Sequence, residues 1–526
     1  MKKGYWLLVL FVFVQCKKEI NPTLTIEKKI VPKVTLDRQS LLLDSNTVST
    51  YKSKGLMDFY RGSAFHTFWV AKENREKILS EIGNCSDQGL NPEDYNYSKL
   101  TALEKNWTTL TPTQIKSYDI LISYNFRIYL AHLATGKMNP KFLYGNWDLK
   151  PKDIAINTLL FEALNTKDIT SALTKCKPKQ QVYVSLLNAL KILATFPNNT
   201  ITTIPFSEKI KPSDTASTLI SIKKRLIYWK DLKSTDSLTE FYDKATVKAL
   251  KKFQFRHGLI PDGVIGKSTI NALNFSKEAR RQQIIANIER WRWFPNEFGS
   301  LYTLVNIPNF SLVVVKNQDT IESHKVVVGT DKRKSPILSS KLSSVVFNPT
   351  WTVPPTILKE DVIPESIKNS NYLASKNIKV YDSNNKEVAI KNWKASKANS
   401  YRYVQDPGVG NSLGQMKILF PNHFSVYLHD TNHKDGFSRH YRSLSSGCTR
   451  IDNPLLLAKT VLDDSINWNS EKIDAVIQAG KTKAIKIKAN ILHYQLYWTA
   501  WSKKDQLYFR EDIYNLDQEL YNRLRN

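Results

Sequence analysis

Apolar residues recur at helical spacing through much of the first 200 positions. The run from 115 to 136 is typical, because its apolar side chains fall near one stripe of a helix and Gly136 is suited to end it. A second run, from 181 to 196, stops before Pro197. We expect the aromatic residues of these runs to pack in a core. The pattern predicts a helical domain over 49–205, with the first stripe at Ile120, Leu121, Tyr124, Ile128 and Leu133.

A second helical unit is predicted between 215 and 276. One amphipathic helix is expected near 219–229 and another near 247–254, before the sequence HGLIPDGVIGKSTINAL. Within it, PDGVIGKS differs by one residue from a phosphate-binding loop, with Pro261 in place of the first glycine. That loop also follows a strand, whereas a helix is expected here, so we predict no nucleotide site.

A strand-like alternation runs from Phe424 to Leu428 and leads into a histidine. Apolar residues occupy one face of this predicted strand, and His429 ends it on the polar face. The chain then becomes polar and rich in turn-forming residues before it reaches Cys448. This return is expected to bring Cys448 beside His429.

A cysteine next to a histidine favours nucleophilic chemistry. A thiol attacks as thiolate, and an imidazole within hydrogen-bond reach is a common way to form one near neutral pH. An inert buried cysteine fits less well, because serine, glycine, threonine and arginine flank Cys448. Zinc is a further alternative, but the histidine spacing suits a helical face and this segment is loop-like, so we expect no metal. The ligands would be His429, His433, His440 and Cys448.

The stretch from 405 to 454 closely resembles the catalytic domain of L,D-transpeptidases of the large periplasmic type. The resemblance rests on QDPGVGNSLGQMKILFPN, YLHDT and SSGCTRID. Two positions depart from the family signature: Ser446 stands where a second histidine is usual, and Thr449 replaces an aliphatic residue. The signature is matched at His429, Ser445, Gly447, Cys448 and Arg450.

The resemblance extends to other parts of the chain. NIERWRWFP at 287–295 and VNIPNF at 305–310 look like the entry to this domain, and VFNPTWTVPPTI at 346–357 looks like its strand and turn into a lid. WTAWSKKDQLYFREDIYNLD at 498–517 looks like its carboxy-terminal extension. The unit at 215–276 resembles a three-helix peptidoglycan-binding domain. Its matching positions, which we expect to be mostly structural, are Phe253, Gln254, His257, Gly258, Leu259, Asp262, Gly263, Gly266, Thr269 and Leu273.

The resemblance implies a multidomain α+β protein. It has a helical scaffold, the three-helix peptidoglycan-binding domain and a mainly β catalytic domain at 300–485, followed by an extension at 486–526. Within the catalytic domain, a polar, lysine-rich insertion at about 355–403 is expected to act as a lid over the active site, although a surface excursion without function is the alternative.

Length and charge agree with this organisation. A chain of 526 residues is too long for one hydrophobic core, and 41% hydrophobic with 24% charged residues is ordinary for a soluble globular protein. The net charge of +28 predicts attraction to an anionic partner. The basic residues are spread along the chain without a block or an aromatic nucleic-acid motif, so we expect an acidic polymer of the cell envelope and no nucleic acid.

The first residues read as a targeting signal. Lys2 and Lys3 precede ten apolar positions, which as a helix would span about 15 Å, too short for a bilayer. Residues 1–16 resemble a bacterial lipoprotein signal in which Cys16 is acylated, and a conventional cleaved signal is the alternative. A polar tether is predicted over 17–48. This indicates a periplasmic lipoprotein held at the membrane.

Two further cysteines, Cys85 and Cys176, have no assigned role. In an oxidising compartment they could pair, and free buried thiols are equally consistent with the sequence.

The resemblance implies a reaction. Cys448 would be the nucleophile and His429 its general acid and base, while the backbone N–H groups of Gly447 and Cys448 would hold the oxyanion. Arg450 and Tyr427 would contact the substrate. The enzyme would release D-alanine from tetrapeptide stems and form 3→3 cross-links through a thioester, without a cofactor and with carbapenems as covalent inhibitors. The alternatives are a degenerate peptidoglycan-binding lipoprotein and an L,D-carboxypeptidase.

Overall fold

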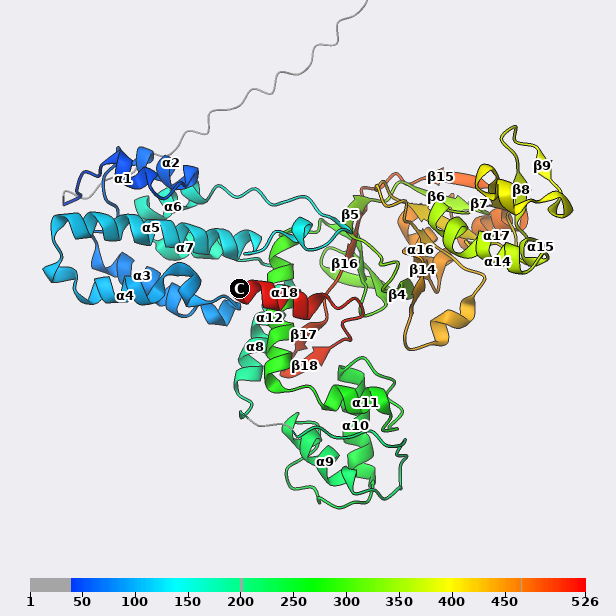
Figure 1. The fold of residues 1–526 in the computed structure, drawn as a ribbon, viewed down its shortest axis with the longest axis horizontal. Helices are drawn as coiled ribbons and strands as arrows, with labels where there is room; N and C mark the ends of the chain where they lie inside the picture. The colour runs from blue at the N-terminus through cyan, green and yellow to red at the C-terminus, as the bar shows by residue number, and fades with distance from the viewer. Residues whose placement is uncertain (1–38, 199–201, 465) are drawn as a thin grey trace, which may run out of the picture.

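The computed structural model describes residues 39–198, 202–464 and 466–526. A helical domain lies at one end of the molecule, a β-rich domain at the other, and a three-helix unit projects from the middle (Figure 1). The predicted signal, its acylated Cys16 and most of the tether lie outside the described residues. None of the described helices is long and apolar enough to cross a membrane.

The helical domain is built around its longest helix, α5. This helix begins with a capping box formed by Thr111 and Gln114 and ends at Gly136, whose φ of 84° suits glycine. The predicted end of this helix is confirmed. The helices are α1 (Ser45–Ser49), α2 (Lys54–Gly62), α3 (Lys72–Gly83), α4 (Tyr97–Lys105), α5 (Pro112–Thr135), α6 (Ile156–Asn165), α7 (Ile169–Cys176) and α8 (Gln181–Ala194).

The folded body begins before residue 48, where the tether was predicted to end. Leu43 and Val48 are buried, α1 already starts at Ser45, and the Leu43 N–H donates to the carbonyl of Phe65 at 2.7 Å. Leu43, the last of three consecutive leucines, and Val48 anchor this end, and they show no helical or strand period that would predict it.

Cys85 and Cys176 are both free and buried in the core of the helical domain. Burial raises the pKa of each thiol to about 12. Of the two possibilities left open by the sequence, the structure has the free thiols.

The three-helix unit contains α9 (Thr218–Tyr228), α10 (Lys244–Arg256) and α11 (Lys267–Leu273). The side-chain amide of Gln254 holds the turn after α10, because its nitrogen donates to the Val264 carbonyl at 3.0 Å and its oxygen accepts from the Gly263 N–H at 2.9 Å. His257 is buried, and its Nδ1 bonds to the Phe253 carbonyl at 2.8 Å. These matched residues are structural, as expected.

A twelve-stranded sheet forms the β-rich domain. Its order is β1-β5-β16-β2-β3-β4-β14-β12-β11-β6-β15, with β13 beside β4. Helices α16 (Pro454–Leu462) and α17 (Ser470–Gln478) accompany it. The strands are β1 (Trp147–Asp148), β2 (Leu301–Asn306), β3 (Ser311–Lys316), β4 (Asp319–Gly329), β5 (Ile337–Lys341), β6 (Ser344–Phe347), β11 (Met416–Leu419), β12 (Leu428–His429), β13 (Ser443–Ser445), β14 (Thr449–Ile451), β15 (Lys483–Lys486) and β16 (Leu492–Leu496).

The carboxy-terminal extension is part of this sheet and does not merely follow it. Strand β16 pairs with β2 on one side and β5 on the other. The boundary predicted at 486 therefore separates residues that share one sheet. After β16 the chain forms the hairpin β17 (Ala500–Lys503) and β18 (Gln506–Phe509), and then α18 (Leu516–Arg525).

The insertion predicted at 355–403 folds as a small module with its own core. A four-stranded sheet and several short helices surround six buried side chains (Figure 1). Its elements are β7 (Trp351–Thr352), α13 (Pro355–Ile357), a π-helical turn (Leu358–Val362), α14 (Ile363–Lys368), α15 (Tyr372–Ser375), β8 (Lys379–Tyr381), β9 (Glu387–Val388) and β10 (Arg402–Gln405).

Helix α12 (Lys277–Trp293) lies at the centre and carries buried charged groups (Figure 1). Arg290 pairs with Asp517 of α18 at 2.9 Å, and both side chains are almost fully buried. Glu289 pairs with Arg292 at 3.1 Å and accepts the Met138 N–H at 2.8 Å. The helix therefore connects the scaffold to the carboxy-terminal extension through paired charges.

We expect Asp517→Ala to lower the free energy of unfolding by about 3–5 kcal/mol, because Arg290 would remain buried without its partner. Glu519→Ala is the matched control on α18: it removes an exposed pair with Arg523 and should cost at most about 0.5 kcal/mol. Urea denaturation followed by tryptophan fluorescence measures both. Equal losses for the two variants would contradict a structural role for the buried pair.

Candidate active site

Three side chains form a row across neighbouring strands. The strand register pairs Lys417 of β11 with His429 of β12, and His429 with Arg450 of β14. Residues paired across strands project from the same face of a sheet, so these three lie side by side. Lys417 was not predicted as a site residue, because its neighbour in the row is twelve positions away in the sequence.

Cys448 lies beside this row. It immediately precedes β14, whose Thr449 N–H donates to the Tyr427 carbonyl at 3.2 Å, so Cys448 is level with Tyr427. Tyr427 lies two positions before His429, and Cys448 lies two positions before Arg450. Tyr427 and Cys448 therefore project from the same face of the sheet as the row. The sequence correctly predicted that Cys448 and His429 belong to neighbouring segments.

The strand predicted over 424–428 is mostly absent. Only Leu428 and His429 form β12, and Ser425 has a φ of 56°, a left-handed conformation that belongs to a turn. Asn422 holds this turn, because its side-chain oxygen accepts from the N–H groups of Phe424 at 3.0 Å and Val426 at 3.2 Å. An asparagine that caps its own turn overrides the alternation of the residues that follow.

The imidazole of His429 is buried and held by the backbone. Its Nδ1 bonds to the carbonyl oxygen of Asp430. Because a carbonyl only accepts, Nδ1 carries the hydrogen and Nε2 retains the lone pair. The Asp430 side chain is engaged elsewhere, since it accepts the Gln415 N–H at 2.8 Å and binds Lys434. A backbone carbonyl therefore orients the ring.

Burial keeps both members of the pair neutral. It raises the pKa of the Cys448 thiol to about 11, against the opposing effects of a backbone hydrogen bond from Tyr427 and a nearby cation. Burial and then the charge of Arg450 lower the pKa of His429 to about 3. The resting arrangement is therefore a thiol beside a neutral imidazole, and not a thiolate–imidazolium pair.

Hydrogen bonds hold the segment Ser445–Cys448, which we call the nucleophile loop. The Ser445 hydroxyl donates to the Cys448 carbonyl at 2.6 Å and accepts the Gly447 N–H at 3.2 Å. Gly447 has a φ of 111°, which disfavours any side chain there. The Gly447 carbonyl accepts from the Ser335 hydroxyl at 2.8 Å. The loop is fixed from both sides.

Each position that departs from the family signature has a partner of its own. The Ser446 hydroxyl accepts a hydrogen bond from Arg333 at 2.9 Å. The Thr449 hydroxyl donates to the side-chain oxygen of Gln495 at 2.7 Å, and Gln495 donates to the Pro336 carbonyl at 2.8 Å. An aliphatic residue at 449 could not bond to a buried glutamine, so the two polar residues depend on each other.

The remaining predicted residues also border the site. Tyr427 is hydrogen-bonded to Trp351 of the insertion, and burial raises the pKa of its hydroxyl. The Lys417 ammonium lies 5.3 Å from the centre of the Tyr427 ring. Burial lowers the pKa of both Lys417 and Arg450. Neither cation makes an ion pair with a described carboxylate, so both are available to a negative charge near the thiol.

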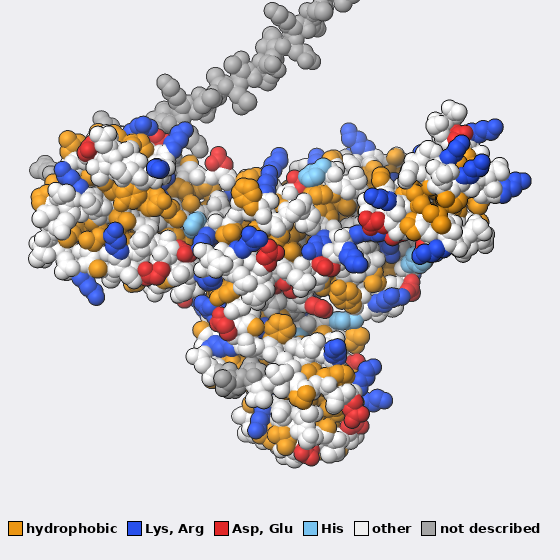
Figure 2. Space-filling view, in the orientation of Figure 1, with side chains coloured by type: hydrophobic (Ala, Val, Ile, Leu, Met, Phe, Trp, Pro, Cys, Tyr) orange, Lys and Arg blue, Asp and Glu red, His pale blue; other side chains and the backbone are white. Residues whose placement is uncertain are grey.

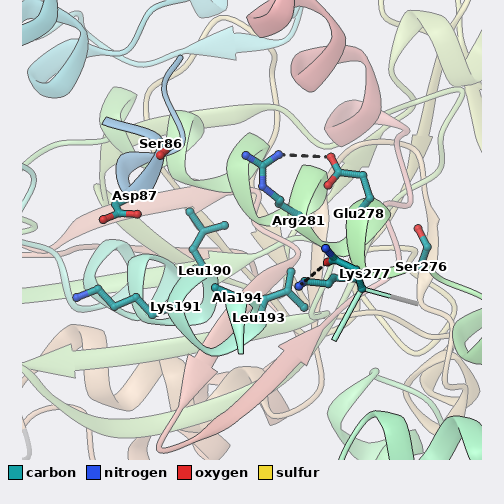
Figure 3. Close-up of a pocket in the computed structure, with 11 residues that line it drawn as sticks. Ser86, Asp87, Leu190, Lys191, Leu193, Ala194, Ser276, Lys277, Glu278 and Arg281 are labelled. Atoms are coloured by element: carbon teal, nitrogen blue, oxygen red, sulfur yellow. Dashed lines mark hydrogen bonds and ion pairs between the residues drawn. The ribbon is translucent and has the colours of Figure 1, made fainter. Parts of the chain in front are cut away.

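The described histidines, cysteines and carboxylates form no group able to hold a metal ion, so the zinc alternative at His433 and His440 has no support in the described geometry. One large hollow lies elsewhere. It measures about 810 Å³ between α8 and the start of α12, and Figure 3 shows Lys191 and Arg281 at its edges. Lys and Arg side chains are spread over the face seen in Figure 2 and form no single patch there.

Three parts of the chain match known families. Residues 54–190 match a scaffold domain, 215–273 a family described as "Putative peptidoglycan binding domain", and 300–475 the L,D-transpeptidase catalytic domain. These matches confirm the resemblance and the fold class expected from the sequence.

Individual relatives agree. A Haemophilus influenzae protein described as "Putative L,D-transpeptidase" is 31% identical over 274 residues, which are 51% of this chain and 55% of that protein. The match spans about half the length of that relative. Crystal structures of L,D-transpeptidases from Xylanimonas cellulosilytica and Stackebrandtia nassauensis are each 12% identical, cover 56% and 57% of this chain and 99% and 97% of their own, and have TM-scores of 0.18 and 0.21. Scores this low carry no argument.

We expect alkylation of Cys448 by iodoacetamide to accelerate about tenfold per pH unit between pH 7 and 9.5, because the thiolate fraction rises in that proportion below a raised pKa. Intact-mass kinetics measure the rate, and Cys448→Ala gives the background from the other cysteines. A plateau near pH 7 would show a preformed ion pair and would contradict this assignment.

Lys417→Met should slow the same alkylation at pH 8 by about three- to tenfold, because a cation that stabilises the thiolate is lost. Lys417→Arg keeps the charge and should stay within about twofold of the wild type. If the two variants reacted equally, the charge of Lys417 would have no bearing on the thiol.

Proposed function

We propose that this chain, whose residues 300–475 match the L,D-transpeptidase catalytic domain, forms 3→3 cross-links in peptidoglycan by way of a cysteine thioester. The observation that carries the proposal is the site itself. A thiol lies beside a backbone-oriented neutral imidazole, with two unpaired cations on the same face of the sheet.

In the first half-reaction the donor stem is cleaved. Nε2 of His429 takes the thiol proton while Sγ of Cys448 attacks the carbonyl that joins the third, diamino acid residue to the terminal D-alanine. The tetrahedral intermediate then expels the D-alanine amine, to which the imidazolium returns the proton. D-Alanine leaves, and a thioester remains on Cys448.

Burial of a neutral pair makes charge compensation essential. As negative charge develops on sulfur and then on the oxyanion, the neighbouring Lys417 and Arg450 stabilise it at short range in surroundings of low polarity. The Cys448 N–H is the first oxyanion donor in this mechanism. The Gly447 N–H becomes the second once it leaves the Ser445 hydroxyl that it now contacts at 3.2 Å.

In the second half-reaction an amine from a neighbouring stem attacks the thioester. His429 takes a proton from this amine and returns it to the departing sulfur, which completes the cross-link. The insertion supports transfer over hydrolysis, because its Trp351 reaches Tyr427 beside the thiol and the module can limit access of water.

Two residues are assigned to substrate contacts. Arg450 can hold a carboxylate of the stem through two parallel hydrogen bonds, since its guanidinium makes no ion pair with a described acid and its Nε has no partner among the described groups. The Tyr427 ring lines the same face. Carbapenems, as strained acyl donors, are expected to acylate Cys448.

We place the enzyme in the periplasm as a lipoprotein anchored through Cys16. The support is the sequence of residues 1–16, together with a family match to a peptidoglycan-binding domain and a net charge of +28, which favours an anionic wall polymer. Radiolabelled palmitate incorporation that is lost in Cys16→Ala tests the anchor.

Incubation with disaccharide tetrapeptides should give cross-linked dimers and free D-alanine, detected by liquid chromatography and mass spectrometry. Tripeptides without dimers would identify a carboxypeptidase, and unchanged substrate would identify a wall-binding protein. Cys448→Ala should abolish both products, and His429→Ala should slow them by about 10²–10⁴-fold. Full dimer formation by Cys448→Ala would exclude Cys448 as the nucleophile.

A further inference from the structure

Arg333 connects the nucleophile loop to the insertion. Its guanidinium donates to Ser446 at 2.9 Å, two residues before the thiol. The same group binds Glu360 at 2.6 and 3.0 Å and Asp361 at 2.6 and 2.8 Å. One side chain therefore contacts both segments that border Cys448.

The segment that carries Arg333 is itself fixed to the nucleophile loop. The Thr330 N–H donates to the Ser445 carbonyl at 3.0 Å, and the Ser335 hydroxyl donates to the Gly447 carbonyl at 2.8 Å. Ser335 is fully buried and also accepts the Gly329 N–H at 2.9 Å. Arg333 thus projects from a rigid support toward a separate module.

The contact on the insertion side has an unusual form. Glu360 and Asp361 are adjacent and belong to the π-helical turn Leu358–Val362, a type of turn often found at functional sites. Two carboxylates on one guanidinium leave the cluster with an excess negative charge, and the hydrogen bonds that Arg333 donates to Asp361 and Glu360 raise its pKa. The carboxylates are about half exposed, whereas the Arg333 side chain is 21% exposed, so the pairing can open without unfolding the support.

We propose that Arg333 is a positioning residue for acyl transfer, which couples the position of the insertion to the geometry of the nucleophile loop through Ser446. The inference rests on the proposed function for its reaction. When Glu360 and Asp361 are engaged, the guanidinium is held at Ser446 and Cys448 is set for attack. When the insertion moves away, Arg333 loses four hydrogen bonds and its hold on Ser446 weakens.

This coupling assigns a structural role to Ser446. A serine hydroxyl is small and accepts a hydrogen bond from Arg333 without adding a charge beside it. The departure from the family signature is thus a contact with the arginine that binds the insertion.

The test compares single-turnover acylation of Cys448 by a tetrapeptide donor, read by intact mass, in variants of the cluster. Arg333→Gln should slow acylation at least tenfold, mainly in the rate at saturating donor and not in the half-saturating concentration. The double variant E360Q/D361N and the variant Ser446→Ala should each slow it by severalfold. Combining either with Arg333→Gln should add nothing further, because all three act through one guanidinium.

Glu365→Gln is the matched control, since it breaks an ion pair with Lys368 on the same insertion, away from the nucleophile loop, and should leave acylation unchanged. Arg333→Lys keeps the charge without the fork of donors and should recover part of the rate. Hydrogen exchange should rise over 355–362 in Arg333→Gln and E360Q/D361N but not in Glu365→Gln.

Acylation within twofold of the wild type in Arg333→Gln would overturn the proposal, and so would additive losses in the combined variants. The rate of iodoacetamide alkylation does not depend on stem peptides. It therefore separates failure of the Arg333 coupling from failure of the proposed transpeptidase function. If the wild type did not react with stems at all, the transpeptidase proposal would fail. The coupling would then be judged from alkylation, which should be faster in both Arg333→Gln and E360Q/D361N because the insertion no longer covers the thiol; unchanged rates would refute it.

Discussion

Burial of charge on α12 is the constraint on which the rest of the structure depends. Arg290 and Arg292 of this helix are fully buried, so each guanidinium needs an acidic partner, which α18 supplies to Arg290 and α12 itself supplies to Arg292. Arg290 needs Asp517 near the end of the chain, and Glu289 joins Arg292 to the scaffold backbone at Met138. The amide of Asn287 adds reciprocal hydrogen bonds to Thr499 at 2.8 and 2.9 Å. The last thirty residues are thereby fixed against the centre of the molecule.

That fixation reaches the segment around Cys448 through two side chains of the carboxy-terminal extension, Gln495 and Tyr514. Gln495, four positions before Thr499, lies on β16 between β2 and β5 and holds Thr449 next to Cys448. Tyr514, three positions before Asp517, accepts the Ser335 N–H at 3.0 Å and donates to the Gly329 carbonyl at 2.7 Å. Because Ser335 in turn bonds to the Gly447 carbonyl, the carboxy-terminal extension supports the loop that carries the thiol.

The sequence predicted the multidomain α+β fold class better than it predicted the setting of the residues around Cys448. The ends of α5 and the pairing of segments around Cys448 follow from local signals such as Gly136 and the signature around 445–450. The place of β16 inside the sheet does not, because strand order depends on contacts between residues almost 200 positions apart. Lys417 was not predicted as a site residue for the same reason, because only the register of three strands puts it in a row with His429. The strand predicted from Phe424 failed because Asn422 folds the turn by its own side chain.

The two departures from the family signature acquire a common explanation from these contacts. Ser446 and Thr449 lie on either side of the thiol. The Ser446 hydroxyl is hydrogen-bonded to Arg333, and the Thr449 hydroxyl is hydrogen-bonded to Gln495. A thiol that burial keeps protonated has no ion pair to hold it in place, so its orientation must come from the backbone on both sides. Polar residues at 446 and 449 supply that orientation. The two positions that depart from the L,D-transpeptidase signature are therefore those at which the segment around Cys448 is hydrogen-bonded to Arg333, which in turn binds the insertion, and to the carboxy-terminal strand β16.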